Sequence, residues 1–432
     1  MLNARFTLSL MTLICFQPLT HAQIIAWKDN IPSSLQPFQN NAQQLANMAQ
    51  DRIIIFSHPQ TKTLIPTASK NPNPSVSFTS SAIVLPVSSD VIAKTLSNYE
   101  QYVGLFPTLK SAKLLEKSGN VSQMKYKVSI PTPIPVLNFN EEITFQHQIN
   151  NNSLSSLVID APIPYGIGKL EWFRLADNKT LVTLTQWGDL NQPKGFLFKK
   201  ILNAIPEAKL GIPSGTNAFI LESLAKKFAA RKEISLAAGQ FPNPELTKQQ
   251  LDLITQVSKN AQQPVSFINP SATVPYQHGR ERMRFVTTYQ YYSQSPQQLQ
   301  KWTQPNSYQS LFPRQIKSIK SSDLVNNSQN ADFKVSVGLG VITIPFNFKL
   351  NFKYPTTTAN EFYANGGDLK YLKGQMQFNP VQQGTLLTMT SAVKIDDQAP
   401  FLLRAVRSLP YHDVLPTVGA NVVFAQKVKS AK

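Results

Sequence analysis

The chain contains a single cysteine, and it lies in a segment that we expect to be removed. Residues 1–22 have the features of a secretory signal peptide: Arg5 supplies a positive charge, residues 6–16 are apolar, and Ala22 is a small residue at the cleavage position. Cleavage after Ala22 would remove Cys15 and leave a mature chain without cysteine. A secreted chain without disulfides depends on large hydrophobic cores. We therefore expect a periplasmic or secreted protein with sizeable domains.

Long apolar runs are also absent. The apolar part of the leader is shorter than the roughly 20 residues that cross a bilayer as a helix, and no later segment is longer. The sequence therefore predicts an exported protein without a membrane-spanning helix.

Acidic residues are scarce relative to basic ones. There are 24 Asp and Glu against 42 Lys and Arg, which gives a formal net charge of +18. Such an excess favours anionic partners such as membrane headgroups, although a basic surface that only keeps the protein soluble is the alternative. The lysines are dispersed, without a run typical of nucleic-acid-binding arms. We expect possible peripheral contact with an anionic membrane and no nucleic-acid partner.

Patterns typical of catalysis or metal binding are missing. The five histidines are scattered and show no metal-ligand spacing, and no glycine-rich phosphate loop occurs. Ser223 and Lys226 match the Ser-x-x-Lys pattern of serine acyl-enzymes, but its companion motifs are absent, so we attribute the match to chance. The sequence therefore predicts no catalytic residue, no metal site and no cofactor.

What the sequence does contain is a repeat. Three motifs return in the same order, 206, 205 and 204 residues later. They are Tyr102–Pro107 with Tyr308–Pro313, Thr180–Thr185 with Thr385–Thr390, and Gly215–Asn217 with Gly419–Asn421. A period this long is too large for a solenoid unit and suits two globular domains. We infer that the chain contains two copies of one domain.

Hydrophobic periodicity gives the same element order in both copies: one strand, two helices, six strands and a long helix. In the first copy the expected elements are a strand at 76–85, helices at 88–99 and up to 107, strands at 112–116, 123–130, 136–148, 154–160, 168–175 and 180–187, and a helix at 196–228 interrupted near Pro206 and Pro213. The second copy runs from a strand at 283–292 to a helix at 401–428.

The flanking segments set the expected domain boundaries. After the leader we expect an N-terminal extension at 23–74, a first domain at 75–230, a linker at 231–275 and a second domain at 276–432. The extension contains a helical pattern and a short strand at 52–56. The linker is rich in proline and carries one helix that begins after Thr247.

This order resembles the helix-grip fold of the START, Bet v 1 and polyketide cyclase superfamily. The residues that carry the resemblance are Tyr102–Pro107 and Tyr308–Pro313 before the strands, and the turn and strand from Asn178. The resemblance implies an α+β fold of two tandem helix-grip domains, each a curved antiparallel sheet wrapped around a long C-terminal helix over a ligand cavity. It does not specify an activity, because such folds host lipid carriers and cyclases alike.

Strand alternation selects candidate residues for these cavities. On 136–148 it places Glu141 among apolar side chains, which suggests a polar anchor for a ligand; pairing with a Lys or Arg, or a bulge that turns Glu141 outward, are the alternatives. The equivalent strand carries Phe348 at the matching sequence position. The full set of cavity candidates is Phe139, Glu141, Phe145, Trp172, Trp187, Phe346, Phe348, Phe352 and Tyr371.

These patterns favour an exported, non-enzymatic binder or carrier of a hydrophobic ligand such as a lipid or isoprenoid. One alternative is a cyclase-like enzyme in which Glu141 performs acid–base chemistry in the same cavity. Another is an envelope scaffold with closed cavities. Proline-rich loops such as 130–135 either protect the sheet edges or dock on a membrane.

Overall fold

The computed structural model describes residues 23–132, 134–229, 232–276 and 279–431. The predicted signal peptide and Cys15 lie outside the described residues. No helix in these ranges is both long enough and apolar enough to span a membrane.

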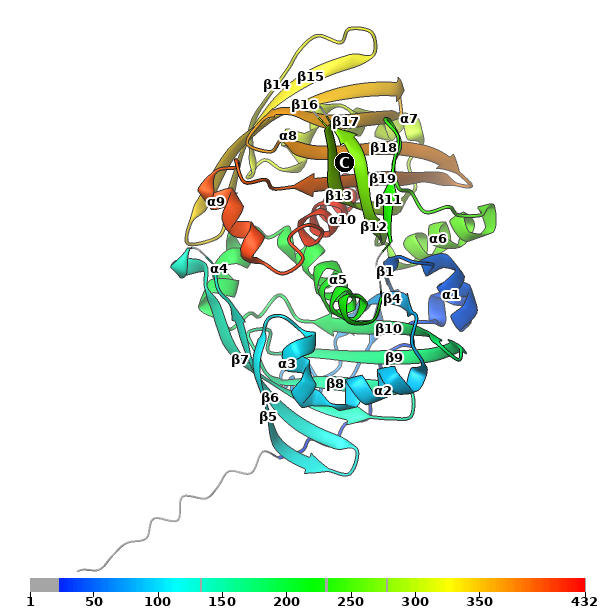
Figure 1. The fold of residues 1–432 in the computed structure, drawn as a ribbon, viewed down its shortest axis with the longest axis vertical. Coiled ribbons are helices and arrows are strands. Elements are labelled where there is room, and N and C mark those ends of the chain that lie inside the picture. The colour runs from blue at the N-terminus through cyan, green and yellow to red at the C-terminus, as the bar shows by residue number, and fades with distance from the viewer. Residues whose placement is uncertain (1–22, 133, 230–231, 277–278, 432) are drawn as a thin grey trace, which may run out of the picture.

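One continuous, almost wholly antiparallel sheet runs through the described part of the molecule (Figure 1). In the first half its strands pair in the order β5 (Leu109–Ser118), β6 (Val121–Ile130), β7 (Phe139–Ile149), β8 (Ser153–Asp160), β9 (Gly166–Ala176), β10 (Lys179–Gly188), β4 (Thr79–Leu85) and β1 (Ile53–Ser57). β1 then pairs with β12 of the second half.

The second half repeats this order outward from the junction. Its strands are β12 (Val265–Tyr276), β13 (Gly279–Tyr292), β19 (Gly384–Lys394), β18 (Tyr371–Val381), β17 (Ala359–Gly367), β16 (Thr343–Thr356), β15 (Ser328–Gly338) and β14 (Ile316–Ser321). The short β11 (Glu233–Ser235) lies parallel to β12, while β2 (Thr61–Lys62) and β3 (Ser75–Val76) pair separately. The two halves of the sheet are thus joined edge to edge.

The long helices of both copies lie together on the concave side of this sheet (Figure 1). They are α5 (Ala208–Phe228) and α10 (Leu415–Ser430). The other helices are α1 (Ala42–Ala49), α2 (Ser89–Ser97), α3 (Tyr102–Leu105), α4 (Phe196–Ala204), α6 (Lys248–Ala261), α7 (Pro296–Leu299), α8 (Tyr308–Leu311) and α9 (Phe401–Arg404). Each half therefore has a curved antiparallel sheet wrapped around a long helix, and the predicted helix-grip fold is confirmed.

The repeated motifs have matching structural roles. Tyr102 and Tyr308 each begin a four-residue helix, and each carbonyl accepts a hydrogen bond from the phenylalanine four residues later, at 2.9 and 3.0 Å. Asn217 of α5 accepts a hydrogen bond from Ser81 of β4 at 2.8 Å. Asn421 of α10 accepts one from Ser391 of β19 at 2.7 Å. These buried amides fix each long helix to its own sheet.

The two halves also meet through their helices. A Cβ added to Gly211 of α5 would lie 3.1 Å from the Cα of Gly419 of α10, so the two backbones are nearly in contact. Arg284 of β13 forms a buried bidentate ion pair with Glu222 of α5, at 2.8 and 3.0 Å. The concave core beside α5 takes in Val286 and Val418 of the second half. Sheet, helices and core therefore all cross the junction.

Proline positions explain two differences from the sequence expectations. Residues 265–276, expected to be part of a linker, form β12, because Pro270 falls where the pairing of β12 with β13 skips a residue. Pro213 does not interrupt the long helix as expected; it lies inside α5, where it forgoes only the hydrogen bond to the carbonyl of Lys209 in the first turn. The break near Pro206 is present, between α4 and α5.

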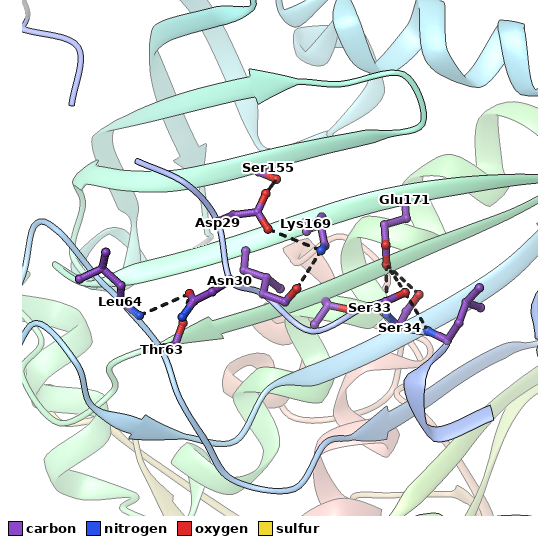
Figure 2. A network of polar contacts seen from close by, with 12 residues as sticks. Asp29, Asn30, Ser33, Ser34, Thr63, Leu64, Ser155, Lys169 and Glu171 are labelled. Atoms are coloured by element: carbon purple, nitrogen blue, oxygen red, sulfur yellow. Dashed lines mark hydrogen bonds and ion pairs between the residues drawn. The ribbon is translucent and has the colours of Figure 1, made fainter. Parts of the chain in front are cut away.

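A polar N-terminal segment lies against β8 and β9, on the side of the sheet opposite the long helices (Figure 2). Asp29 accepts a hydrogen bond from Ser155 and pairs with Lys169 at 3.5 Å. The backbone N–H of Ser34 donates to Glu171 Oε2 at 3.1 Å, and Ser34 Oγ lies 2.7 Å from Thr183 Oγ1. Lys169 and Glu171 alternate with concave-facing residues along β9. The concave face is therefore the side left for a ligand.

Candidate ligand-binding site

The concave side of β7 changes from buried to accessible along its length. His147 is buried, whereas Phe145, Ile143, Glu141 and Phe139 are all partly exposed, so we call the Phe139 end the accessible end of the strand. Glu142, which points the other way, pairs with Lys125 on the outer surface at 2.5 Å. The accessible end of β7 approaches α4, because a Cβ added to Gly195 would lie 3.3 Å from Oε1 of Glu141.

Three hydrogen-bonded side chains lie at the buried end. Tyr126 of β6, His147 of β7 and Ser156 of β8 form a chain in which Tyr126 Oη is 2.9 Å from His147 Nε2 and His147 Nδ1 is 2.8 Å from Ser156 Oγ. We call these residues the polar triple. His147 and Ser156 are cross-strand partners, so the sheet register fixes their contact.

Aromatic rings surround the polar triple. The ring of Tyr99 stacks on His147 with centroids 4.8 Å apart, and Phe145 lies 5.8 Å from it on the same strand. Tyr102 stacks against Tyr126 at 6.1 Å and donates its hydroxyl proton to the carbonyl of Leu96 at 2.7 Å. Tyr126 and His147 are therefore buried among aromatic rings, while Ser156 is partly exposed.

Burial keeps this group neutral. It lowers the pKa of His147 to about 3 and raises the pKa of Tyr99 to about 12. Burial also raises the pKa of Tyr126 far above its usual value. A neutral imidazole has one N–H donor and one acceptor nitrogen. The triple therefore offers hydrogen bonds without a net charge near neutral pH.

The second half has three phenylalanines in the same register. The sequence Tyr126-Lys-Val-Ser129 returns as Phe333-Lys-Val-Ser336, 207 residues later. His147 of β7 pairs with Ser156 of β8, and at the equivalent place in the second half Phe352 of β16 pairs with Phe362 of β17. The ring centroids of Phe352 lie 6.5 Å from Phe333 and 5.8 Å from Phe362. The polar triple is thus specific to the first half.

The structure places most predicted cavity residues on the concave side and two elsewhere. Strand alternation and shared clusters put seven of them on the concave side: Phe139, Glu141, Phe145, Trp172, Phe346, Phe348 and Phe352. Trp187 packs instead with Trp27 and Phe78 under the N-terminal segment. Tyr371 packs with Tyr276 and Phe285 on the other side of the second half. These two residues alternate with concave ones, and the strand phase explains the difference.

Glu141 is accessible and has no hydrogen-bond or ion-pair partner among the described residues. Neither alternative expected for it, an ion pair or an outward bulge, is seen, because its ladder with Val128 is regular. The register also corrects the sequence matching. Val335, the counterpart of Val128, pairs with Phe346, so Phe346 rather than Phe348 stands where Glu141 does.

Tyr126, Ser156 and Tyr99 were not among the predicted residues. Tyr126 begins the sequence that returns at Phe333–Ser336, and comparison of the two copies shows a tyrosine in the first where the second has a phenylalanine. Ser156 has no such signal, because its contact with His147 depends on strand register.

Two hollows of the described surface lie away from this face. A pocket of about 220 Å³ lies between the end of β1 and α6, lined in part by His58, Gln256 and Asn260. Burial lowers the pKa of His58 to about 4, and the charge of Lys169 adds to this effect. Its Nε2 is 2.7 Å from Ser80 Oγ. A second hollow surrounds the exposed turn at 150–152.

Two arrangements considered in the sequence can be checked against the described ranges. No group of three or more His, Cys, Asp or Glu side chains could hold a metal ion there. Ser223 is buried and donates to the carbonyl of Phe219 at 2.9 Å, whereas Lys226 is exposed, so the Ser-x-x-Lys match has no nucleophile–base geometry.

Comparisons with known proteins identify similar folds. No protein-family model matches this chain, and no curated protein matches it at sequence level. Among solved structures it is similar to the two-domain aromatase/cyclase StfQ of the steffimycin pathway, with 10% identity, TM-score 0.25, and coverage of 80% of this chain and 97% of that one. It is also similar to the two-domain aromatase/cyclase BexL of the BE-7585A pathway, with 9% identity, TM-score 0.27, and coverage of 82% and 99%.

A single-domain similarity is found as well. A fragment of the STAR-related lipid transfer protein from Xanthomonas axonopodis matches with 15% identity and TM-score 0.25, covering 35% of this chain and 85% of the fragment. The chain is therefore similar to START-like proteins, including two-domain ones. Identities and scores at this level indicate no activity or ligand for this chain.

Proposed function

We propose that this protein is an exported binder or carrier of a hydrophobic ligand that has one neutral polar group, held on the concave face of the first half. The observation that carries the proposal is the polar triple of Tyr126, His147 and Ser156, packed against aromatic rings in one copy and replaced by phenylalanines in the other. A buried polar group is costly unless it is hydrogen-bonded, so an apolar triple would serve a purely structural core equally well.

Apolar burial is sufficient for binding by such a face. Removing about 400 Å² of apolar surface from water contributes roughly 10 kcal/mol before association costs. Those costs of at least about 4 kcal/mol leave micromolar affinity within reach. The accessible end of β7, next to α4, is the entrance that we propose for the ligand.

The geometry favours a carrier over an acid–base enzyme. Glu141 and His147 lie on the same strand, six residues apart, which separates them by about 20 Å along an extended chain. The low pKa of His147 leaves it neutral, and both of its ring nitrogens already have partners. Glu141 and His147 are thus not placed to exchange a proton with one substrate atom.

Location and membrane contact belong to the same proposal. The leader at 1–22 supports export, and the net charge of +18 supports reversible contact with anionic membranes. In the loop at 130–138, Ile134 is partly exposed and Val136 is 53% exposed. Ile134→Asp should weaken binding to anionic vesicles, because it adds a negative charge and removes apolar surface.

The test is binding of the neutral fluorescent probe N-phenyl-1-naphthylamine and its displacement by lipids that differ in one hydroxyl group. Tyr126→Phe should lower the affinity for the hydroxylated lipid by about five- to thirtyfold, which is the loss expected for one hydrogen bond. The affinity for the fully apolar lipid should stay unchanged. Tyr102→Phe is the matched control, because it removes a hydroxyl that donates to a backbone carbonyl. The proposal would be contradicted if the probe does not bind, or if Tyr126→Phe and Tyr102→Phe have equal effects.

A further inference from the structure

Two exposed phenylalanines occupy equivalent positions in the two copies. Phe196 begins α4 and Phe401 begins α9, and each follows the last strand of its own half. Phe196 is 70% exposed and Phe401 is 54% exposed, although phenylalanine is normally buried. An exposed aromatic residue at one such position needs no explanation, but its presence in both copies does.

Both helices border the same end of one hairpin. The β15–β16 turn lies against α4, because a Cβ added to Gly340 would lie 2.5 Å from the backbone of Lys200. α9 packs on the adjoining start of β16, where Leu403 shares a cluster with Phe346. Figure 1 shows α4 and α9 on the same side of the molecule. Two more exposed apolar residues, Val136 and Leu409, lie in the β6–β7 loop and just after α9.

Basic side chains accompany the two rings. Lys199 and Lys200 follow Phe196 in α4, and Arg404 follows Phe401 in α9; all three are exposed. Nζ of Lys200 lies 5.6 Å from the centre of the Phe196 ring. None of the three forms an ion pair with a described residue. Lys194 and Arg407, in contrast, pair with Asp160 and Asp397.

We propose that these residues form a membrane-docking surface that binds anionic lipid headgroups through its cations and inserts its rings at the headgroup level. We define this twin-helix surface as Phe196, Phe401, Val136 and Leu409 with Lys199, Lys200 and Arg404. Charge and apolar surface together match an anionic bilayer, which attracts each nearby basic residue and accepts aromatic side chains at its interface.

The position of this surface links it to the ligand site. Gly195, directly before Phe196, lies against Glu141 at the accessible end of β7. Docking through α4 would therefore place the entrance of the concave face at the membrane, which is where a lipid ligand would enter or leave. This link rests on the proposed ligand-carrier function, whereas the docking itself does not.

The experiment is flotation of the whole protein with vesicles of phosphatidylcholine, with or without phosphatidylglycerol, at low and high salt. The wild type should float with the anionic vesicles at low salt and less at high salt. Phe196→Ser/Phe401→Ser and Lys199→Gln/Lys200→Gln/Arg404→Gln should each lower the partition coefficient by about tenfold or more.

Matched controls lie at the far end of the same hairpin, roughly 30 Å away along β15. Leu324→Ser/Val325→Ser removes two equally exposed apolar side chains. Lys320→Gln/Lys353→Gln removes two exposed charges next to that turn. Both control variants should float like the wild type.

Three outcomes would contradict the proposed docking surface. They are no flotation of the wild type, equal losses in the twin-helix and control variants, or a twin-helix variant that changes only the oligomeric state, which would mean that the surface binds a second copy. Probe binding measured on the same samples separates the two proposals. Vesicle binding without probe binding leaves the docking surface and removes the ligand carrier.

Discussion

At the scale of single residues, the buried imidazole of His147 has a consequence that can be measured. Its folded-state pKa of about 3 lies below the ordinary value of 6.5, because burial disfavours the charged form. The unfolded chain therefore binds more protons between these values, and stability present above pH 6.5 is lost as the pH falls toward 3. His58 acts in the same direction with a pKa of about 4.

The His147→Phe variant, which copies the second half, should flatten this pH dependence. We expect the wild type to lose about 2 kcal/mol of unfolding free energy through His147 between pH 6.5 and 5. Urea unfolding at both pH values measures this change. If the variant loses as much stability as the wild type, His147 is not held neutral in the folded protein.

Glu141 provides a second test at this scale. Its carboxylate is accessible and has no partner among the described residues, so Glu141→Gln should leave the thermal midpoint unchanged or slightly higher. Glu141 lies about 20 Å along β7 from His147, so a five- to thirtyfold loss in probe displacement by a hydroxylated lipid would place the ligand's polar group at Glu141 rather than at the polar triple. A variant that loses stability but keeps its affinity would make Glu141 a structural residue.

At the scale of elements, the sequence predicts most of the helices and strands but not how the halves join. Periodicity and turn residues place β4 to β10 and β13, because each strand is set by local alternation, and predict six further strands in the second half. The single helix expected at 401–428 is instead divided into α9 and α10. β12 is missed because Pro270 and Pro275 suggest a linker. In the structure the bulge accommodates Pro270, and Pro275 lies at the end of the strand. Trp187 and Tyr371 are assigned to the wrong face because alternation does not identify which face is concave.

The close crossing of α5 and α10 can be tested by the stability of glycine variants. Gly211→Ala would bring a methyl group to 3.1–3.2 Å from Gly419, so we expect a loss of about 1–3 kcal/mol from overpacking. Gly215→Ala on the same helix is the control, because its Cβ would meet nothing within 4 Å, and it should stabilise by up to about 1 kcal/mol. Denaturant unfolding of both variants decides the matter; equal effects would mean that the helices do not pack this closely.

At the scale of the whole molecule, the halves share a sheet, a helix crossing and a core. The core around Phe56 on the convex side draws residues from α1 and α6, just as the concave core draws on both long helices. We therefore expect calorimetry to show one unfolding transition rather than two. The Arg284→Met variant removes the buried bidentate ion pair between Arg284 and Glu222 and should lower the free energy of unfolding by about 2–4 kcal/mol. Glu222→Leu/Arg284→Met should recover most of that loss, and two independent transitions in the wild type would contradict a joined fold.

The central claim is that the first half holds a hydrophobic ligand next to its polar triple. Native mass spectrometry of the freshly purified protein, followed by solvent extraction and lipid analysis, tests it most directly. The account predicts one co-purifying hydrophobic molecule with a neutral polar group, lost or reduced in Tyr126→Phe/His147→Phe and retained in a variant of the second half such as Phe362→Leu. A protein that carries no such molecule, or one whose molecule is lost only from the second-half variant, would contradict it.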